Sequence, residues 1–240
     1  MADAAAAEGS SGKKWFPLES NPDVMTRYIE RLGFDTSRHA FVDVLSTDDW
    51  ALDMVPQPAL AVLMLFPVKA ASEAHRAEEA ARIEREGQVV SPDVYYMKQT
   101  VGNACGTVGL LHAVGNAATK ANDSFLSRFL ARTRGQTPDA IATVLAEDTE
   151  LEETHGAAAA EGQSAAPALD EDVTTHFVCF VEVGGRLYEL DGRKRSPIDH
   201  GATTPAALLR DAARVVRAFM ARDPEELRFT IVALAPLADE

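Results

Sequence analysis

Two strand-like segments separated by Gly184 and Gly185 constrain the fold more than any other feature of the sequence. The segments HFVCFVEV (176–183) and RLYELDG (186–192) are rich in β-branched and aromatic residues, and paired glycines supply the positive φ angles that a two-residue turn needs. Apolar side chains occupy both faces of these strands, which is typical of a sheet covered on both sides. The sequence therefore predicts an α/β (α+β) fold with an antiparallel sheet flanked by helices on both sides.

Capping residues and prolines indicate where the other elements begin and end. Asn21 and Pro22 are typical of a helix start, and this helix is expected to run to about Leu32 and to stop near Gly33. An apolar run at 59–66, bounded by prolines, predicts a buried strand. Further helices are expected at 46–52, at 72–86, from Thr137-Pro138 and from Thr204-Pro205 to about 221, and a last strand at 227–237.

Length and charge narrow the class of protein. A chain of 240 residues with 46% hydrophobic content suffices for one sizeable core, so we expect a flexible tail at 1–13 and one domain at 14–240. The net charge of −14 disfavours nucleic acid and anionic membranes as partners and favours a basic protein or peptide. The longest apolar run is too short to span a bilayer, and the N-terminus lacks the pattern of a secretory signal. A soluble, cytoplasmic monomer is expected.

The segment 147–172 differs from the rest of the chain. It contains nine acidic residues, no Lys or Arg, and an alanine-rich centre. Such a composition buries too little apolar surface to offset the entropy of ordering, so the segment is expected to be a structureless loop. Loops of this length inside a domain are often functional, although a tolerated surface insertion is the alternative.

Cysteine usage points to Cys105 as a reactive thiol. The chain has two cysteines, too few for a disulfide framework or a structural zinc site, and no metal or cofactor is expected. Cys105 lies where a glycine-flanked loop gives way to a helical pattern, and the positive end of a helix favours a thiolate. The alternative is a small buried side chain, and this interpretation is the better one for Cys179 in the middle of a strand.

A thiol hydrolase also needs a base and a group that orients the base. If Val183 pairs with Arg186 across the turn, His176 and Asp191 become diagonal neighbours on one face of the hairpin, about 7–8 Å apart at the backbone. Asp191 can then hold the imidazole in one tautomer. The backbone N–H of Cys105 and the side chain of Gln99 are candidate donors to an oxyanion. The remaining histidines fit a catalytic role less well, namely His39, His75, His112, His155 and His200.

These motifs resemble those of the short, single-domain ubiquitin carboxyl-terminal hydrolases of the cytosolic isozyme type, along residues 15–237. The stretches that carry the resemblance are WFPLESNPDV (15–24), FVDV (41–44), MVPQP (54–58), VYYMKQT (94–100), NACGT (103–107), EGQSAAPALDEDV (161–173), HFVCFVEV (176–183), LYELDGRK (187–194) and RDPEELRF (222–229). The resemblance implies that Cys105 is the nucleophile, His176 the general base, Asp191 its orienting residue and Gln99 the oxyanion side chain.

The resemblance also carries expectations about fold and substrate. It implies a papain-like placement of the catalytic groups, a knotted backbone, and a crossover loop at about 148–172 that lies over the cleft and admits small or flexible adducts. Pro17, Leu18 and Leu169 are expected to contact the apolar patch of ubiquitin. The implied activity is hydrolysis of amide, ester or thioester bonds at the C-terminal glycine of ubiquitin. Two alternatives stay open: a hydrolase of a ubiquitin-like modifier, and a non-catalytic ubiquitin-binding protein.

Overall fold

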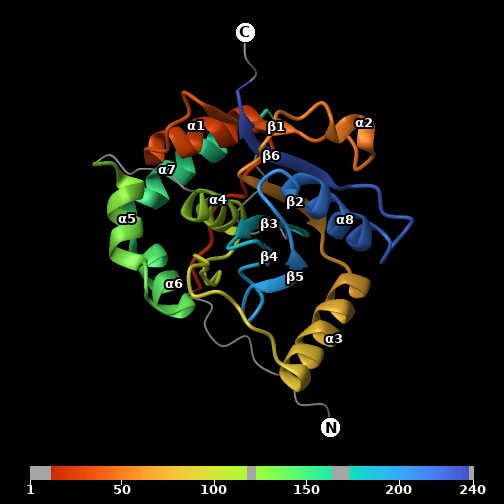
Figure 1. Cartoon of the computed structure of the whole chain (residues 1–240). Coiled ribbons are helices and arrows are strands. Elements are labelled where there is room, and N and C mark those ends of the chain that lie inside the picture. The colour runs from red at the N-terminus through yellow and green to blue at the C-terminus, as the bar shows by residue number, and fades with distance from the viewer. Residues whose placement is uncertain (1–11, 118–122, 164–172, 238–240) are drawn as a thin grey trace.

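One mixed sheet-and-helix unit is built from the residues that the computed structural model describes, 12–117, 123–163 and 173–237. Six strands form one sheet in the order β1-β6-β2-β3-β4-β5, and every neighbouring pair is antiparallel (Figure 1). The strands are β1 His39–Asp43, β2 Ala61–Pro67, β3 Thr175–Val183, β4 Arg186–Leu190, β5 Ile198–Ala202 and β6 Thr230–Pro236. The helices are α1 Pro22–Leu32, α2 Asp49–Leu52, α3 Ala70–Glu86, α4 Cys105–Asn116, α5 Phe125–Thr133, α6 Pro138–Glu147, α7 Thr149–Ala160 and α8 Leu208–Met220.

The β3–β4 hairpin has the register that the sequence predicts. Gly184 and Gly185 adopt φ angles of 60° and 80°, and Val183 pairs with Arg186. The pairing continues without a slip to Cys179 opposite Leu190. Because side chains alternate between the two faces of a strand, this register fixes which residues of β4 face each residue of β3.

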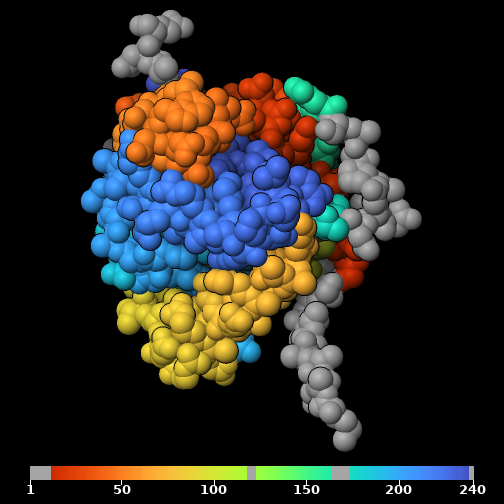
Figure 2. Space-filling view, turned by 90° about the vertical axis from the view of Figure 1, so that its right-hand side faces the viewer, coloured from red at the N-terminus to blue at the C-terminus, as the bar shows by residue number. Residues whose placement is uncertain are grey.

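Helices cover both faces of the sheet, as predicted. One apolar core joins side chains of β3 such as Phe177 to α1, α4, α5, α6 and α7, and a second joins Val178 and Phe180 to α2 and α8 (Figure 1). Figure 2 shows the side of the molecule on which α8 lies across the middle. On this side α3 and the residues after it form a lobe at the lower edge. In the part of the chain that the structure describes, no helix has both the length and the apolarity needed to cross a bilayer.

The prediction of a structureless segment at 147–172 is wrong for the residues that form α7. Asp148 caps this helix, because its Oδ1 accepts a hydrogen bond of 3.0 Å from the N–H of Leu151. Leu151, His155 and Ala158 follow at helical spacing, are buried, and pack on α1. This narrow apolar stripe orders an otherwise acidic and alanine-rich segment. The connection between α7 and β3 covers 161–174, of which 164–172 lie outside the described residues, and the crossover loop there stays a prediction.

Several element boundaries also differ from the expectation. The second helix starts only at Asp49, and the helix expected from Pro205 starts at Leu208 after a turn. Helix α5 and the edge strand β5, which contains His200, were not predicted from the sequence. Residues 1–11 of the expected tail lie outside the described residues, but Lys13 belongs to the folded part because its Nζ lies 2.6 Å from Glu152 Oε2. The domain limits 14–240 and the knot stay predictions.

Candidate active site

Cys105 is the first residue of α4, as the sequence predicts. The loop before it turns through Asn103, which has a φ of 60° and whose Nδ2 donates a hydrogen bond of 3.1 Å to the carbonyl of Trp15. Ala104 is the N-cap, so the Cys105 amide is among those at the start of the helix that have no helical partner. The thiol therefore lies at the positive end of the helix dipole, which favours its ionised form.

His176 and Asp191 meet at the open end of the hairpin. His176 is near the start of β3, Asp191 directly follows β4, and both are buried. Nε2 of His176 lies 2.6 Å from Oδ1 of Asp191, and the backbone N–H of Arg193 donates to the same oxygen at 2.8 Å. The diagonal contact predicted from the hairpin register is confirmed.

The thiol of Cys105 completes a chain of three side chains. It interacts with the imidazole of His176, and because Asp191 occupies Nε2, Nδ1 is the ring nitrogen left to bond the sulfur. Backbone N–H groups of Phe177 and Gly106 also donate to the sulfur. The amide of Phe177 is a contribution that the sequence analysis missed, because no pattern of residue types reveals a backbone donor.

Charge interactions within the triad favour a thiolate–imidazolium pair. Burial raises the pKa of Cys105, but the hydrogen bond to His176, the charge of His176 and the two amides outweigh burial and lower it. Burial lowers the pKa of His176, but the carboxylate of Asp191 and the contact with Cys105 raise it to about 10. Burial raises the pKa of Asp191, but the charge of His176 and its hydrogen bond hold it well below its ordinary value.

Gln99 lies between the Asp191 turn and α4. Its backbone N–H donates to the carbonyl of Gly192 at 2.9 Å, and a Cβ on Gly192 would stand 3.0 Å from the Cβ of Gln99 and 3.1 Å from Val108. A glycine at 192 is what allows this close approach. The side-chain Nε2 donates to the carbonyl of Val101 at 3.2 Å, and the buried Oε1 has no hydrogen-bond partner among the described residues. Its oxyanion role stays a prediction.

The three residues expected to contact ubiquitin differ in their exposure to solvent. Pro17 is half-buried, whereas Leu18 is only 5% exposed and packs against Gly106, where a Cβ would approach Leu18 to 2.8 Å. The missing side chain of Gly106 lets Leu18 pack on α4, and its contact with ubiquitin stays a prediction. Phe16, which is 40% exposed, is the apolar side chain that this segment presents to solvent. Leu169 lies outside the described residues.

A buried hydrogen-bond network that the sequence analysis missed supports the first turn of α4. Nδ1 of His155 lies 2.7 Å from Oγ1 of Thr107, which in turn lies 2.8 Å from the hydroxyl of Tyr28. Nε2 of His155 bonds to the carbonyl of Phe16 at 2.6 Å. Burial lowers the pKa of His155, so the network uses the neutral ring. No sequence pattern indicates these contacts, because they join four segments that are distant along the chain.

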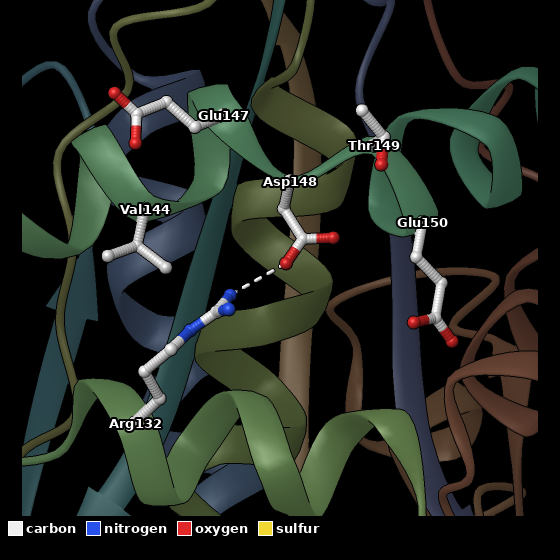
Figure 3. A pocket seen from close by; sticks show the side chains of 6 residues that line it. All are labelled: Arg132, Val144, Glu147, Asp148, Thr149 and Glu150. Atoms are coloured by element: carbon white, nitrogen blue, oxygen red, sulfur yellow. Dashed lines mark hydrogen bonds and ion pairs between the residues drawn. The ribbon is translucent and has the colours of Figure 1, made fainter.

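An open hollow of about 520 Å³ at the junction of α5, α6 and α7 is separate from the triad. Figure 3 shows that Arg132 points across it to Asp148, with which it forms an ion pair of 2.6 Å. The other carboxylate oxygen of Asp148 caps α7. Both charged groups are therefore used within the fold, and the hollow contributes no further catalytic group.

Comparisons with known proteins agree with this geometry. The family described as "Ubiquitin carboxyl-terminal hydrolase, family 1" matches residues 15–221. "Ubiquitin carboxyl-terminal hydrolase 3" of Arabidopsis thaliana is 46% identical over 97% of this chain and 98% of its own length, and human "Ubiquitin carboxyl-terminal hydrolase isozyme L1" is 43% identical over 92% and 98%.

A solved structure has the same fold. The catalytic domain of Trichinella spiralis UCH37 bound to ubiquitin vinyl methyl ester superposes with a TM-score of 0.73, at 20% identity, over 94% of this chain and 96% of that one. At this identity the likeness is evidence of fold, while the family match and the curated relatives carry the assignment. The chain belongs to family 1 of the ubiquitin carboxyl-terminal hydrolases.

Proposed function

We propose that this chain is a cysteine hydrolase that cleaves amide, ester or thioester bonds at the C-terminal glycine of ubiquitin. The observation that carries the proposal is the unbroken contact from the Cys105 thiol through His176 to Asp191 at the tip of α4. The names of its relatives support ubiquitin as the substrate. The net charge of −14 also suits the basic tail of ubiquitin, which ends in two glycines narrow enough for a confined cleft.

The proposed reaction is acyl transfer through a thioester. The Cys105 thiolate attacks the carbonyl carbon of the last glycine, and the oxyanion accepts hydrogen bonds from the Cys105 amide and the Gln99 side chain. The imidazolium of His176 gives its proton to the leaving group. His176 then removes a proton from water, which hydrolyses the thioester, while Asp191 keeps the imidazole in one orientation.

Substrate size and compartment are the finer parts of the proposal. The chain leaves α7 at Glu161 and enters β3 at Thr175, and we assign this crossover the role of limiting the leaving group to small or flexible adducts. Cytoplasmic localisation is proposed because both cysteines are free, which is usual for proteins of reducing compartments.

Hydrolysis of a ubiquitin C-terminal fluorogenic amide tests the proposal. The parent chain should release the fluorophore, and free ubiquitin should compete better than ubiquitin-like modifiers at equal concentration. A folded protein that binds ubiquitin without turnover would instead be the non-catalytic binding protein. If a ubiquitin-like modifier competed more strongly than ubiquitin, that modifier would be the substrate instead.

Loss of the Gln99 side chain should slow chemistry more than binding. We expect Gln99→Ala to lower kcat by about 10²–10³-fold with little change in KM, because an oxyanion donor acts mainly in the transition state. Steady-state kinetics on the fluorogenic amide measure both constants. Gln136→Ala, at an exposed glutamine of the α5–α6 connection, is the matched control and should match the parent. A Gln99→Ala rate close to the parent rate would remove Gln99 from the mechanism.

The alkaline limb of the pH profile should report His176. The imidazolium is required to protonate the leaving group, so kcat/KM should fall as pH rises through the raised pKa of His176, about 10. Removing the carboxylate with Asp191→Asn removes the interaction that raises this pKa, so the limb should move to lower pH. The pH dependence of kcat/KM is measured across the alkaline range for the parent and for Asp191→Asn, both folded. Identical alkaline limbs in the two proteins would contradict the pairing of Asp191 with His176.

A further inference from the structure

Three consecutive basic residues follow Asp191 and Gly192, and each pairs with a different glutamate of α3. The pairs are Arg193 with Glu73 at 2.9 Å, Lys194 with Glu79 at 2.5 Å, and Arg195 with Glu84 at 3.8 Å. The segment that carries the orienting carboxylate of the triad is therefore fastened to α3 along its length.

Only the Lys194 pair is buried. The side chains of Lys194 and Glu79 are 7% and 8% exposed, whereas those of Arg195 and Glu84 are 82% and 74% exposed. Nζ of Lys194 also lies 2.5 Å from Oε1 of Glu189, a fully buried residue of β4. One ammonium group thus connects α3 to the strand that leads into Asp191.

Lys194 also closes the turn that aims Asp191 at the imidazole. Its backbone N–H donates to the carbonyl of Asp191 at 2.9 Å. The hydroxyl of Tyr96 lies 2.8 Å from the carbonyl oxygen of Asp191 and 2.7 Å from that of Lys194. Since Oδ1 of Asp191 receives the Arg193 amide within this same turn, the direction of the carboxylate depends on the turn.

Ion pairs rather than apolar packing join α3 to this segment, and the Lys194–Glu79 pair is the buried one among them. Glu79 is the only buried residue of α3, and a hollow of about 580 Å³ is lined by residues of the helix and of the segment 193–198. Figure 2 shows α3 in the lobe at the edge of the molecule. A buried ion pair adds little stability compared with an apolar pair, because both charges lose their hydration. What this pair supplies is a fixed geometry between α3, β4 and the Asp191 turn.

We propose that Lys194 is a positioning residue for the hydrolysis: it ties α3 and β4 to the turn after β4, and so holds the Asp191 carboxylate against Nε2 of His176. The inference rests on the proposed roles of Asp191 and His176. Lys194 contacts neither the thiol nor the imidazole, so it acts through Asp191. Its positive charge near Asp191 also favours the ionised carboxylate.

A double variant, Glu79→Gln with Lys194→Met, tests the inference. It removes both charges of the pair, and Glu189 keeps its contact with His200 at 2.8 Å. We expect kcat to fall by about 10- to 100-fold with KM nearly unchanged, because a carboxylate displaced by an ångström orients the imidazole poorly. The alkaline limb of kcat/KM should also move to lower pH. The matched control is Glu84→Gln with Arg195→Met, the exposed pair, which should match the parent in both readouts.

The readouts separate positioning from stability and from the proposed function. The concentration of reactive Cys105 thiol is titrated in each sample, and each rate is divided by it. A fraction of unfolded protein therefore changes neither kcat nor the midpoint of the alkaline limb. The parent enzyme must first show ubiquitin hydrolysis that requires Cys105, which establishes the proposed function independently. If the folded double variant keeps the parent kcat and limb, the inference is wrong.

A gentler variant decides the question if the double variant does not fold. Glu79→Gln alone leaves Lys194 paired with Glu189, so no buried charge loses its last partner. It should shift the alkaline limb in the same direction with a smaller loss of kcat. A folded Glu79→Gln protein with the parent profile would overturn the inference.

Discussion

Cys105→Ala should lower kcat/KM for a ubiquitin C-terminal amide by at least about 10⁴-fold, because no other group can form the thioester. Affinity for ubiquitin should persist, since Cys105 is a small side chain at the tip of α4 and the rest of the surface is unchanged. Initial rates measure the first effect, and calorimetric titration with ubiquitin measures the second.

Cys179→Ala is the matched control for this substitution. Cys179 is fully buried in β3, and burial raises the pKa of its thiol, so it should contribute nothing to turnover. The folded fraction of this variant should have the parent kcat. Turnover by Cys105→Ala within tenfold of the parent would contradict the assigned nucleophile, and so would loss of activity confined to Cys179→Ala.

His176→Asn should lower kcat/KM by about 10²–10⁴-fold, the usual contribution of a general acid and base. The same change should raise the pKa of the Cys105 thiol, because the hydrogen bond and charge of His176 are the largest effects that lower it. The rate of thiol alkylation by a small haloacetamide, measured against pH, follows the thiolate directly. Its midpoint should move to higher pH in His176→Asn.

His39→Asn is the control for the second substitution. His39 is half-buried at the start of β1, where its ring contacts Phe34, and within the described part of the chain no hydrogen bond or ring contact joins it to the triad. Rates and the alkylation midpoint should match the parent. A His176→Asn protein that keeps the parent midpoint would show that another group ionises the thiol.

The hairpin and its catalytic pair could be predicted from the sequence because they depend on local rules. Two glycines fix the turn, the turn fixes the register, and the register places His176 diagonal to Asp191. The start of α4 at Cys105 and the caps of α1 follow from similarly local signals. Contacts of this kind need no knowledge of the rest of the fold.

Features that depend on distant segments could not be predicted in this way. The order of α7 comes from a stripe of three side chains that finds its partner on α1, and composition alone indicated a loop. The burial of Leu18 depends on Gly106, and that of Lys194 on Glu79, more than 80 residues away in each case. The sequence identifies such residues as apolar or charged but does not reveal which segment they meet.

Labelling with ubiquitin vinyl methyl ester, followed by peptide mapping, tests the central claim most directly. The electrophile places a reactive carbon where the scissile carbonyl of ubiquitin would lie, so only a thiol aligned for attack should react. We predict one adduct, on Cys105, that is lost in Cys105→Ala and retained in Cys179→Ala. An adduct on Cys179, or a folded chain that gives none, would contradict the account.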